Sequence, residues 1–294
     1  MWSANRLPGP FGAQVVGLDL AKDQSSETMS RLGRLLYENR FLVIGGQAID
    51  TATYLSFGRK WGAPIPLINP DGRNVEFPEI TETTNAPDRQ KSYAMHWHQD
   101  NSYDTVPSAI TMLHCLEAPD EGGETLFVDC VAAYEALPAE VQARIESLVV
   151  LHGLGRGKPL PEENIIDPRT TGQDLSRLTH FDTVRHPLVR RHPVTGEKAF
   201  YGLGGTSFGI EGMDQAEGQA LLRELKLHAI APQFRTQCKA RQDDILIWDN
   251  LLVMHSATLI EHSDEPGKRR RLLRISVRGA PTFAVEAKAL ESHA

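Results

Sequence analysis

Apolar positions in the first sixty residues predict two short strands and two amphipathic helices. Ala13 to Leu20 alternates between apolar and polar residues as a strand does, and Ser25 to Glu38 carries leucines and a methionine at helical spacing. A β-rich run from Phe41 to Ile44 ends at two glycines, and a second helix is predicted from about Thr51 to Trp61. Strands and helices therefore alternate at the start of the chain.

Short strands dominate the rest of the chain. Residues 63–93 are rich in Pro, Asn, Asp and Thr, which is typical of a loop with a strand or two, and residues 155–185 are polar and lack any period. The other predicted elements are strands at Ala109–Leu116 and Glu124–Asp129, a helix at Val131–Val149 interrupted near Pro138, a hairpin around His192–Gly196, a helix at Asp214–His228, and strands at Asp244–Trp248, Leu251–His255 and Leu272–Val277. This order predicts a mainly β fold, an antiparallel sandwich with flanking helices.

Composition narrows the classes of protein that fit this pattern. The chain has 294 residues, 40% of them hydrophobic, and a formal net charge of −7, which argues against a general nucleic-acid binder. Three cysteines without C-x-x-C spacing indicate neither a disulfide framework nor a thiolate zinc site. No apolar stretch has the length of a signal-peptide core or the ~20 residues of a membrane span. We therefore expect a cytoplasmic protein that binds neither nucleic acid nor membrane, and self-association stays open.

Pairs of histidine and acid two positions apart are candidates for metal ligands. In a strand, residues i and i+2 point to the same side, so such a pair supplies two ligands at once. With 11 His and 38 acidic residues among 294, about 1.4 pairs (11 × 38/294) are expected by chance, and the chain holds three. They are His98/Asp100, His180/Asp182 and His262/Asp264. Spacing alone does not choose among them.

The residues around His98 and Asp100 separate this pair from the other two. Four motifs follow one another along the chain: Trp97-His98-x-Asp100, Gly122-Gly123-x-Thr125, Trp248-Asp249-Asn250-x4-His255, and Arg270-x3-Arg274. Together they resemble the taurine/2,4-D dioxygenase family of Fe(II)- and 2-oxoglutarate-dependent enzymes. The resemblance covers nearly the whole chain and is weakest at residues 63–92 and 155–185. It implies one dioxygenase domain over residues 1–294 with a double-stranded β-helix (jelly-roll) core. The absence of a period at 155–185 favours an active-site lid there, with a disordered loop as the alternative.

The resemblance also implies the ligands of the metal and of the cosubstrate. His98, Asp100 and His255 match the two imidazoles and one carboxylate that hold Fe(II) on one face, leaving positions for 2-oxoglutarate and O2. Arg270, helped by Thr125, matches the residue that binds the distal carboxylate of 2-oxoglutarate. His96 is interpreted as a residue of the substrate pocket and not as a ligand. An ordinary strand threonine remains the alternative for Thr125, as does a core histidine for His255.

The run Lys268 to Arg271 offers three arginines for the distal carboxylate, so strand register has to select one. Residues 270, 272 and 274 share one face of a strand, and 269 and 271 share the other. Only Arg270 and Arg274, with Gly279 behind them, reproduce the family's two arginines four residues apart. Arg274 then matches the residue that meets the acid group of the substrate. The alternative for Arg274 is an internal salt bridge with a distant acid.

The activity that the resemblance implies is hydroxylation of an unactivated C–H bond in a small, anionic organic substrate, with release of succinate and CO2. A carboxylate, sulfonate or sulfate would suit Arg274. Desaturation or ring formation by the same cofactors stays open. Two other classes are a metal-binding jelly roll without activity and a zinc hydrolase, for which no motif supplies an acid/base partner beside a metal-bound water.

Overall fold

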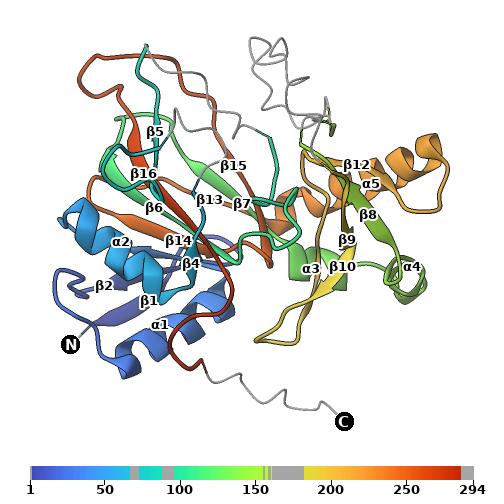
Figure 1. The fold of residues 1–294 in the computed structure, drawn as a ribbon, viewed down its shortest axis with the longest axis horizontal. Helices are drawn as coiled ribbons and strands as arrows, with labels where there is room; N and C mark the ends of the chain where they lie inside the picture. The colour runs from blue at the N-terminus through green and yellow to red at the C-terminus, as the bar shows by residue number, and fades with distance from the viewer. Residues whose placement is uncertain are drawn as a thin grey trace.

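Two stacked sheets form the centre of the computed structural model (Figure 1), which describes residues 2–66, 73–87, 96–154, 156–157, 160 and 182–285. The larger sheet contains, in order, β1 (Ser3–Arg6), β2 (Ala13–Val16), β3 (Phe41–Ile44), β14 (Ile245–Asp249), β6 (Ile110–Glu117), β16 (Arg271–Arg278) and β4 (Ala63–Pro64), with β5 (Thr81–Thr84) also on β16. The smaller sheet contains β13 (Arg235–Cys238), β7 (Thr125–Asp129) and β15 (Val253–Ala257). All neighbours in both sheets are antiparallel except β2 and β3. The predicted sandwich is confirmed.

Side chains from both sheets fill the space between them. Phe41 and Trp248 of the larger sheet pack with Phe127 of the smaller one, and the rings of Phe41 and Phe127 stack with centroids 4.4 Å apart. Burial of each such aromatic or aliphatic side chain contributes roughly 1.5–3 kcal/mol. This interior holds the two sheets face to face, and the candidate site uses their inward side chains.

Two helices cover the outer face of the larger sheet. They are α1 (Ser26–Asn39), capped by the Ser25 side chain, and α2 (Thr51–Lys60), capped by Asp50. Leu273 and Ile275 of β16 pack in the core beneath these helices, whereas Leu272 packs in the interior of the sandwich. The even-numbered face of β16 therefore points inward, as predicted.

A third region lies to one side of the sheets in Figure 1 and has its own apolar core. Its elements are the sheet β12 (Ser207–Ile210), β8 (Val149–His152) and β9 (Val184–Pro187), the hairpin β10 (Val189–Arg191) and β11 (Lys198–Phe200), the helices α3 (Cys130–Glu135), α4 (Ala139–Ile145) and α5 (Gln215–Ala229), and the short 3-10 helix Pro232–Phe234. The lid expected around 155–185 falls mostly outside the described residues, as do residues 67–72 and 88–95.

Some predicted boundaries are wrong for local reasons. The first predicted strand ends at Val16, because Gly17 takes a φ of 79° that breaks the extended backbone. The helix predicted over Val131–Val149 is two short helices, with Pro138 at the start of the second, and Val149 already begins β8. Within the described residues, no helix combines the length and apolarity that crossing a membrane requires.

Candidate metal centre

Two distant stretches of the chain meet at the free edge of the smaller sheet. His255 lies in the middle of β15, and its backbone N–H donates to the carbonyl of His98 at 2.9 Å, while His98 N–H donates back at 3.0 Å. This single bridge attaches His98 to the edge of β15. The strand geometry used above for pairs two positions apart does not apply to His98 and Asp100, because Asp100 already lies in a turn and Asn101 takes a φ of 55°. Pairing with His255, and not a long strand, orients the segment.

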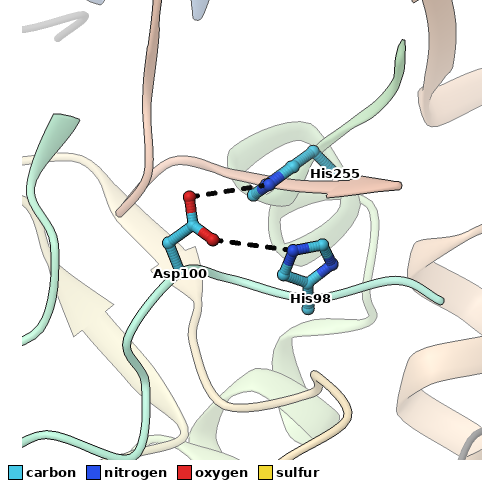
Figure 2. Close-up of side chains that lie close together, drawn as sticks. All are labelled: His98, Asp100 and His255. Atoms are coloured by element: carbon cyan, nitrogen blue, oxygen red, sulfur yellow. Dashed lines mark ion pairs between the residues drawn. The ribbon is translucent and has the colours of Figure 1, made fainter. Parts of the chain in front are cut away.

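The side chains of His98, Asp100 and His255 converge on one point (Figure 2). Nε2 of His98 lies 3.6 Å from Oδ1 of Asp100, and Nε2 of His255 lies 3.7 Å from Oδ2. One ligand atom from each residue lies within 4.8 Å of the other two, and the described residues hold no other such group of His, Cys, Asp and Glu. Two imidazoles with one carboxylate are the donors of non-haem iron oxygenases, so the residues present fit such a metal.

Protonation states also suit metal binding. Nδ1 of His98 lies 2.7 Å from the backbone oxygen of His96, which can only accept, so Nδ1 carries a proton and Nε2 is the nitrogen that can bind a metal. Burial holds the pKa of His255 far below its usual value, which keeps this ring neutral. The Nε2 atoms of both imidazoles therefore face the Asp100 carboxylate.

Asp100 is buried and ionised. Burial raises the pKa of its carboxyl, but the positive charge of Arg274 beside it outweighs this effect and holds the pKa well below the usual range. Nη1 of Arg274 lies 3.2 Å from Oδ1, and the hydroxyl of Thr111 donates to Oδ2 at 2.8 Å. Sequence reasoning missed Thr111, and a threonine among the apolar residues of β6 was the one signal that pointed to it.

The Asp249-Asn250 turn links the two stretches that carry the triad. The Asp249 carboxylate accepts from the N–H groups of Leu251 and Leu252, which shapes the turn before β15. The Asn250 amide accepts from Asp100 N–H and donates to the backbone oxygens of Asp100 and Ser108, each at 3.0 Å. The turn that leads into the strand of His255 thus also holds the segment of Asp100.

Asn250→Ala is expected to destabilise the metal-free protein by about 2–4 kcal/mol, because it leaves several buried backbone groups without partners. Urea unfolding measures this loss. Asn39→Ala, which removes one half-buried bond to the oxygen of Leu35, serves as the control and should lose less than about 1 kcal/mol. Equal losses in the two variants would contradict the role given to Asn250.

Thr125 and Arg270 line one small cavity between the sheets. Its wall also contains Cys115, Leu113 and Leu272, so it is largely apolar. Burial lowers the pKa of Arg270 to about 10, and Nε donates to the oxygen of Gly123. No carboxylate among the described residues pairs with this guanidinium. A buried cation of this kind needs an anion, and the cavity places Thr125 beside it.

The neighbouring arginines face the other way. Arg271 pairs with Glu82 at 2.7 Å, and Arg269 pairs with Glu117 at 3.2 Å. A bulge between Arg271 and Leu272 shifts the register of β16 against β6 but leaves residues 270 and 272 at the same cavity. The structure therefore puts Arg270, of the three candidates, on the inner side.

Arg274 and His96 each contact one residue of the triad. Arg274 pairs with Asp100, 174 positions away, so the structure contains the salt bridge with a distant acid that the sequence left as the alternative for Arg274. The ring of His96 tilts against that of His98 at 5.3 Å and is not part of the metal group. Burial lowers the pKa of His96 to about 3, so its ring is neutral. A Cβ on Gly205 would overlap this ring, so His96 is packed tightly in place.

Comparison with known proteins agrees with this geometry. The model of the family "Taurine catabolism dioxygenase TauD, TfdA family" matches residues 3–276. The chain is 29% identical over 270 residues to the alpha-ketoglutarate-dependent 2,4-dichlorophenoxyacetate dioxygenase of Cupriavidus pinatubonensis, covering 86% of this chain and 90% of that protein. It is 28% identical over 287 residues to an alkylsulfatase of Acinetobacter baylyi, and the match covers 94% of this chain and 85% of that protein. It spans only 45% of a Schizosaccharomyces pombe relative that is 37% identical over 189 residues.

Solved structures give the same fold. The structure of AAD-2 in complex with Mn(II) and N-oxalylglycine superposes with a TM-score of 0.77 at 28% identity, covering 96% of this chain and all of that one. This likeness confirms the predicted jelly-roll core. Enzymes of this family use Fe(II), 2-oxoglutarate and O2, and the His-Asp-His group fits that metal. The chain is an alpha-ketoglutarate-dependent dioxygenase and belongs to the TauD, TfdA family.

Proposed function

We propose that the enzyme hydroxylates an unactivated C–H bond of a small organic acid whose anionic group binds Arg274. In this proposal His98, Asp100 and His255 hold Fe(II), and Thr125 and Arg270 bind the distal carboxylate of 2-oxoglutarate. With 2-oxoglutarate and O2, the metal supplies the oxidising chemistry that releases succinate and CO2. His96 contributes to the wall of the substrate pocket.

The observation that carries the proposal is the position of Arg274. Its side chain lies beside Asp100 and is 24% exposed, so it is neither fully enclosed nor free in solvent. A guanidinium has five N–H donors, and the contact with Asp100 involves Nη1 alone. The remaining donors can bind a carboxylate, sulfonate or sulfate next to the triad.

The balance of charge supports an anionic substrate. A metal dication with Arg270 and Arg274 brings four positive charges, whereas Asp100 and 2-oxoglutarate bring three negative ones. Counting these groups alone, one positive charge remains in a site with little access to water, and an anionic substrate would neutralise it. The names of relatives fit this class, since they include a 2,4-dichlorophenoxyacetate dioxygenase and an alkylsulfatase.

The remaining residues orient and protect the reacting carbon. Asn250 holds the turn of Asp100 in place through the backbone, and the His96 carbonyl sets the tautomer of His98. Arg274 would fix the acid end of the substrate, so that the carbon to be oxidised lies at a set distance from the metal. Binding of the acid group by Arg274 would then determine which C–H bond lies within reach of the metal.

A comparison of an acid with its neutral amide tests the proposal. A succinate-release screen over carboxylates, sulfonates and alkyl sulfates first identifies a substrate. Wild type should then prefer the acid over its amide by about 30-fold or more, because loss of one partner of a charged hydrogen-bonded pair costs about 2–5 kcal/mol. Arg274→Ala should remove most of that preference and leave the KM for 2-oxoglutarate nearly unchanged. Equal use of acid and amide by wild type would refute this substrate class.

A further inference from the structure

Two hydroxyl groups lie behind the Asp100 carboxylate on neighbouring strands of the larger sheet. Thr111 of β6 and Ser276 of β16 are direct cross-strand partners, and both are buried. Their oxygens are 3.2 Å apart, and the Thr111 hydroxyl lies 2.8 Å from Oδ2 of Asp100. Both side chains point into the sandwich from the same face as Arg274, whose side chain contacts the other oxygen of Asp100.

The direction of these hydrogen bonds follows from the single hydrogen that each hydroxyl group can donate. An ionised carboxylate only accepts, so the single hydrogen of the Thr111 hydroxyl points to Asp100. The Thr111 oxygen can then only accept from Ser276, and Ser276 must be the donor of the second bond. The result is a one-way relay, Ser276 to Thr111 to Asp100, that ends on the carboxylate.

We propose that Thr111 is a positioning residue that sets the orientation and metal affinity of Asp100, and that Ser276 acts through it. This inference rests on the proposed iron site. Donors on both carboxylate oxygens fix the plane of the group, since Arg274 holds Oδ1 and Thr111 holds Oδ2. Without Thr111 the carboxylate is free to turn toward Arg274, and metal binding has to restore its orientation.

The two donors differ in one respect that matters for function. Arg274 is partly exposed and, under the proposed function, also binds the substrate acid, whereas Thr111 is fully buried in the sheet. The hydrogen bond from Thr111 to Asp100 therefore remains when a substrate anion binds Arg274 and when it does not. The relay can thus orient Asp100 in the absence and in the presence of substrate, which Arg274 alone would not do.

Metal titration of the purified full-length protein tests the relay. Co(II) is added without oxygen to metal-free wild type, Thr111→Val, Thr111→Ser and Ser276→Ala, and the Kd is measured by calorimetry and by visible absorption. Thr111→Val should weaken binding about 10- to 100-fold, the usual effect of losing a partner of a metal ligand. Thr111→Ser, which keeps the hydroxyl, should stay within about 3-fold of wild type. Ser276→Ala should weaken binding in the wild-type background but not in Thr111→Val.

The matched control is Ser108→Ala. Ser108 is a buried serine near the same turn whose hydroxyl donates to Asn101 and contacts no triad residue. Its Kd for Co(II) should equal that of wild type, even if urea unfolding shows a loss of stability. Wild-type affinity in Thr111→Val, or an equal loss in Ser108→Ala, would overturn the inference.

Two further variants, Ser276→Ala and His255→Ala, separate failure of the relay from failure of the proposed iron site. If Thr111→Val does not fold, Ser276→Ala decides, and an unchanged Kd in that variant overturns the relay. His255→Ala tests the iron site itself, because it should lose Co(II) binding altogether. Wild-type affinity in His255→Ala refutes the proposed site, whereas its loss together with an unaffected Thr111→Val refutes the relay alone.

Discussion

His255→Ala is expected to bind no Fe(II) and to release no succinate, while the chain remains folded. In the proposed site His255 offers one of three ligand atoms, and the other two come from one short segment, His98 and Asp100. A ligand that binds the folded state alone stabilises it by about 2.7 kcal/mol at a concentration 100 times its Kd. Added metal should therefore raise the Tm of wild type and leave the Tm of the variant unchanged.

A second buried histidine provides the control for this variant. His114 lies on β6, and its Nε2 bonds to the oxygen of Gln47, away from the triad. His114→Ala should lower the Tm but keep both the metal-induced rise in Tm and the turnover. Metal-dependent turnover in His255→Ala at the level of wild type would show that the triad is wrongly assigned.

Arg270→Ala is expected to raise the KM for 2-oxoglutarate by about 30-fold or more. The cavity that Arg270 shares with Thr125 is small and largely apolar, and a carboxylate left there without its cation loses about 2–5 kcal/mol. The change should appear in KM measured at saturating metal and substrate. Metal affinity in the absence of 2-oxoglutarate should stay close to that of wild type.

Arg271→Ala is the natural control, because the two arginines are neighbours on opposite faces of one strand. Arg271 pairs with Glu82, outside the cavity. Its replacement should leave the KM for 2-oxoglutarate within about 2-fold, as expected for a partly exposed ion pair. The reverse result, with KM raised in Arg271→Ala alone, would mean that the inward face of β16 is the odd-numbered one.

Patterns in the chain predicted the parts of the site that depend on local periodicity. Alternation along residues 270–277 gave the correct inward face of β16, because a two-residue period survives wherever one face packs on helices and the other on a second sheet. The bulge after Arg271 could not be seen in the sequence, yet it does not change which of the arginines reaches the cavity.

The parts that escaped prediction depend on contacts between distant segments. The segment of His98 is aligned by one bridge to His255 and by the amide of Asn250, neither of which has a local pattern. The contacts of Asp100 with Thr111 and Arg274 likewise join separate strands. The residue types in the motifs indicated which side chains form the site. The contacts that position these side chains are seen only in the folded structure.

A crystal structure of this protein with Mn(II) and N-oxalylglycine, a stable analogue of 2-oxoglutarate, is the most direct test of the proposed site. We expect the metal on Nε2 of His98, the carboxylate of Asp100 and Nε2 of His255, with the distal carboxylate of the analogue on Arg270. Metal bound elsewhere, or a distal carboxylate that does not reach Arg270, would contradict the account.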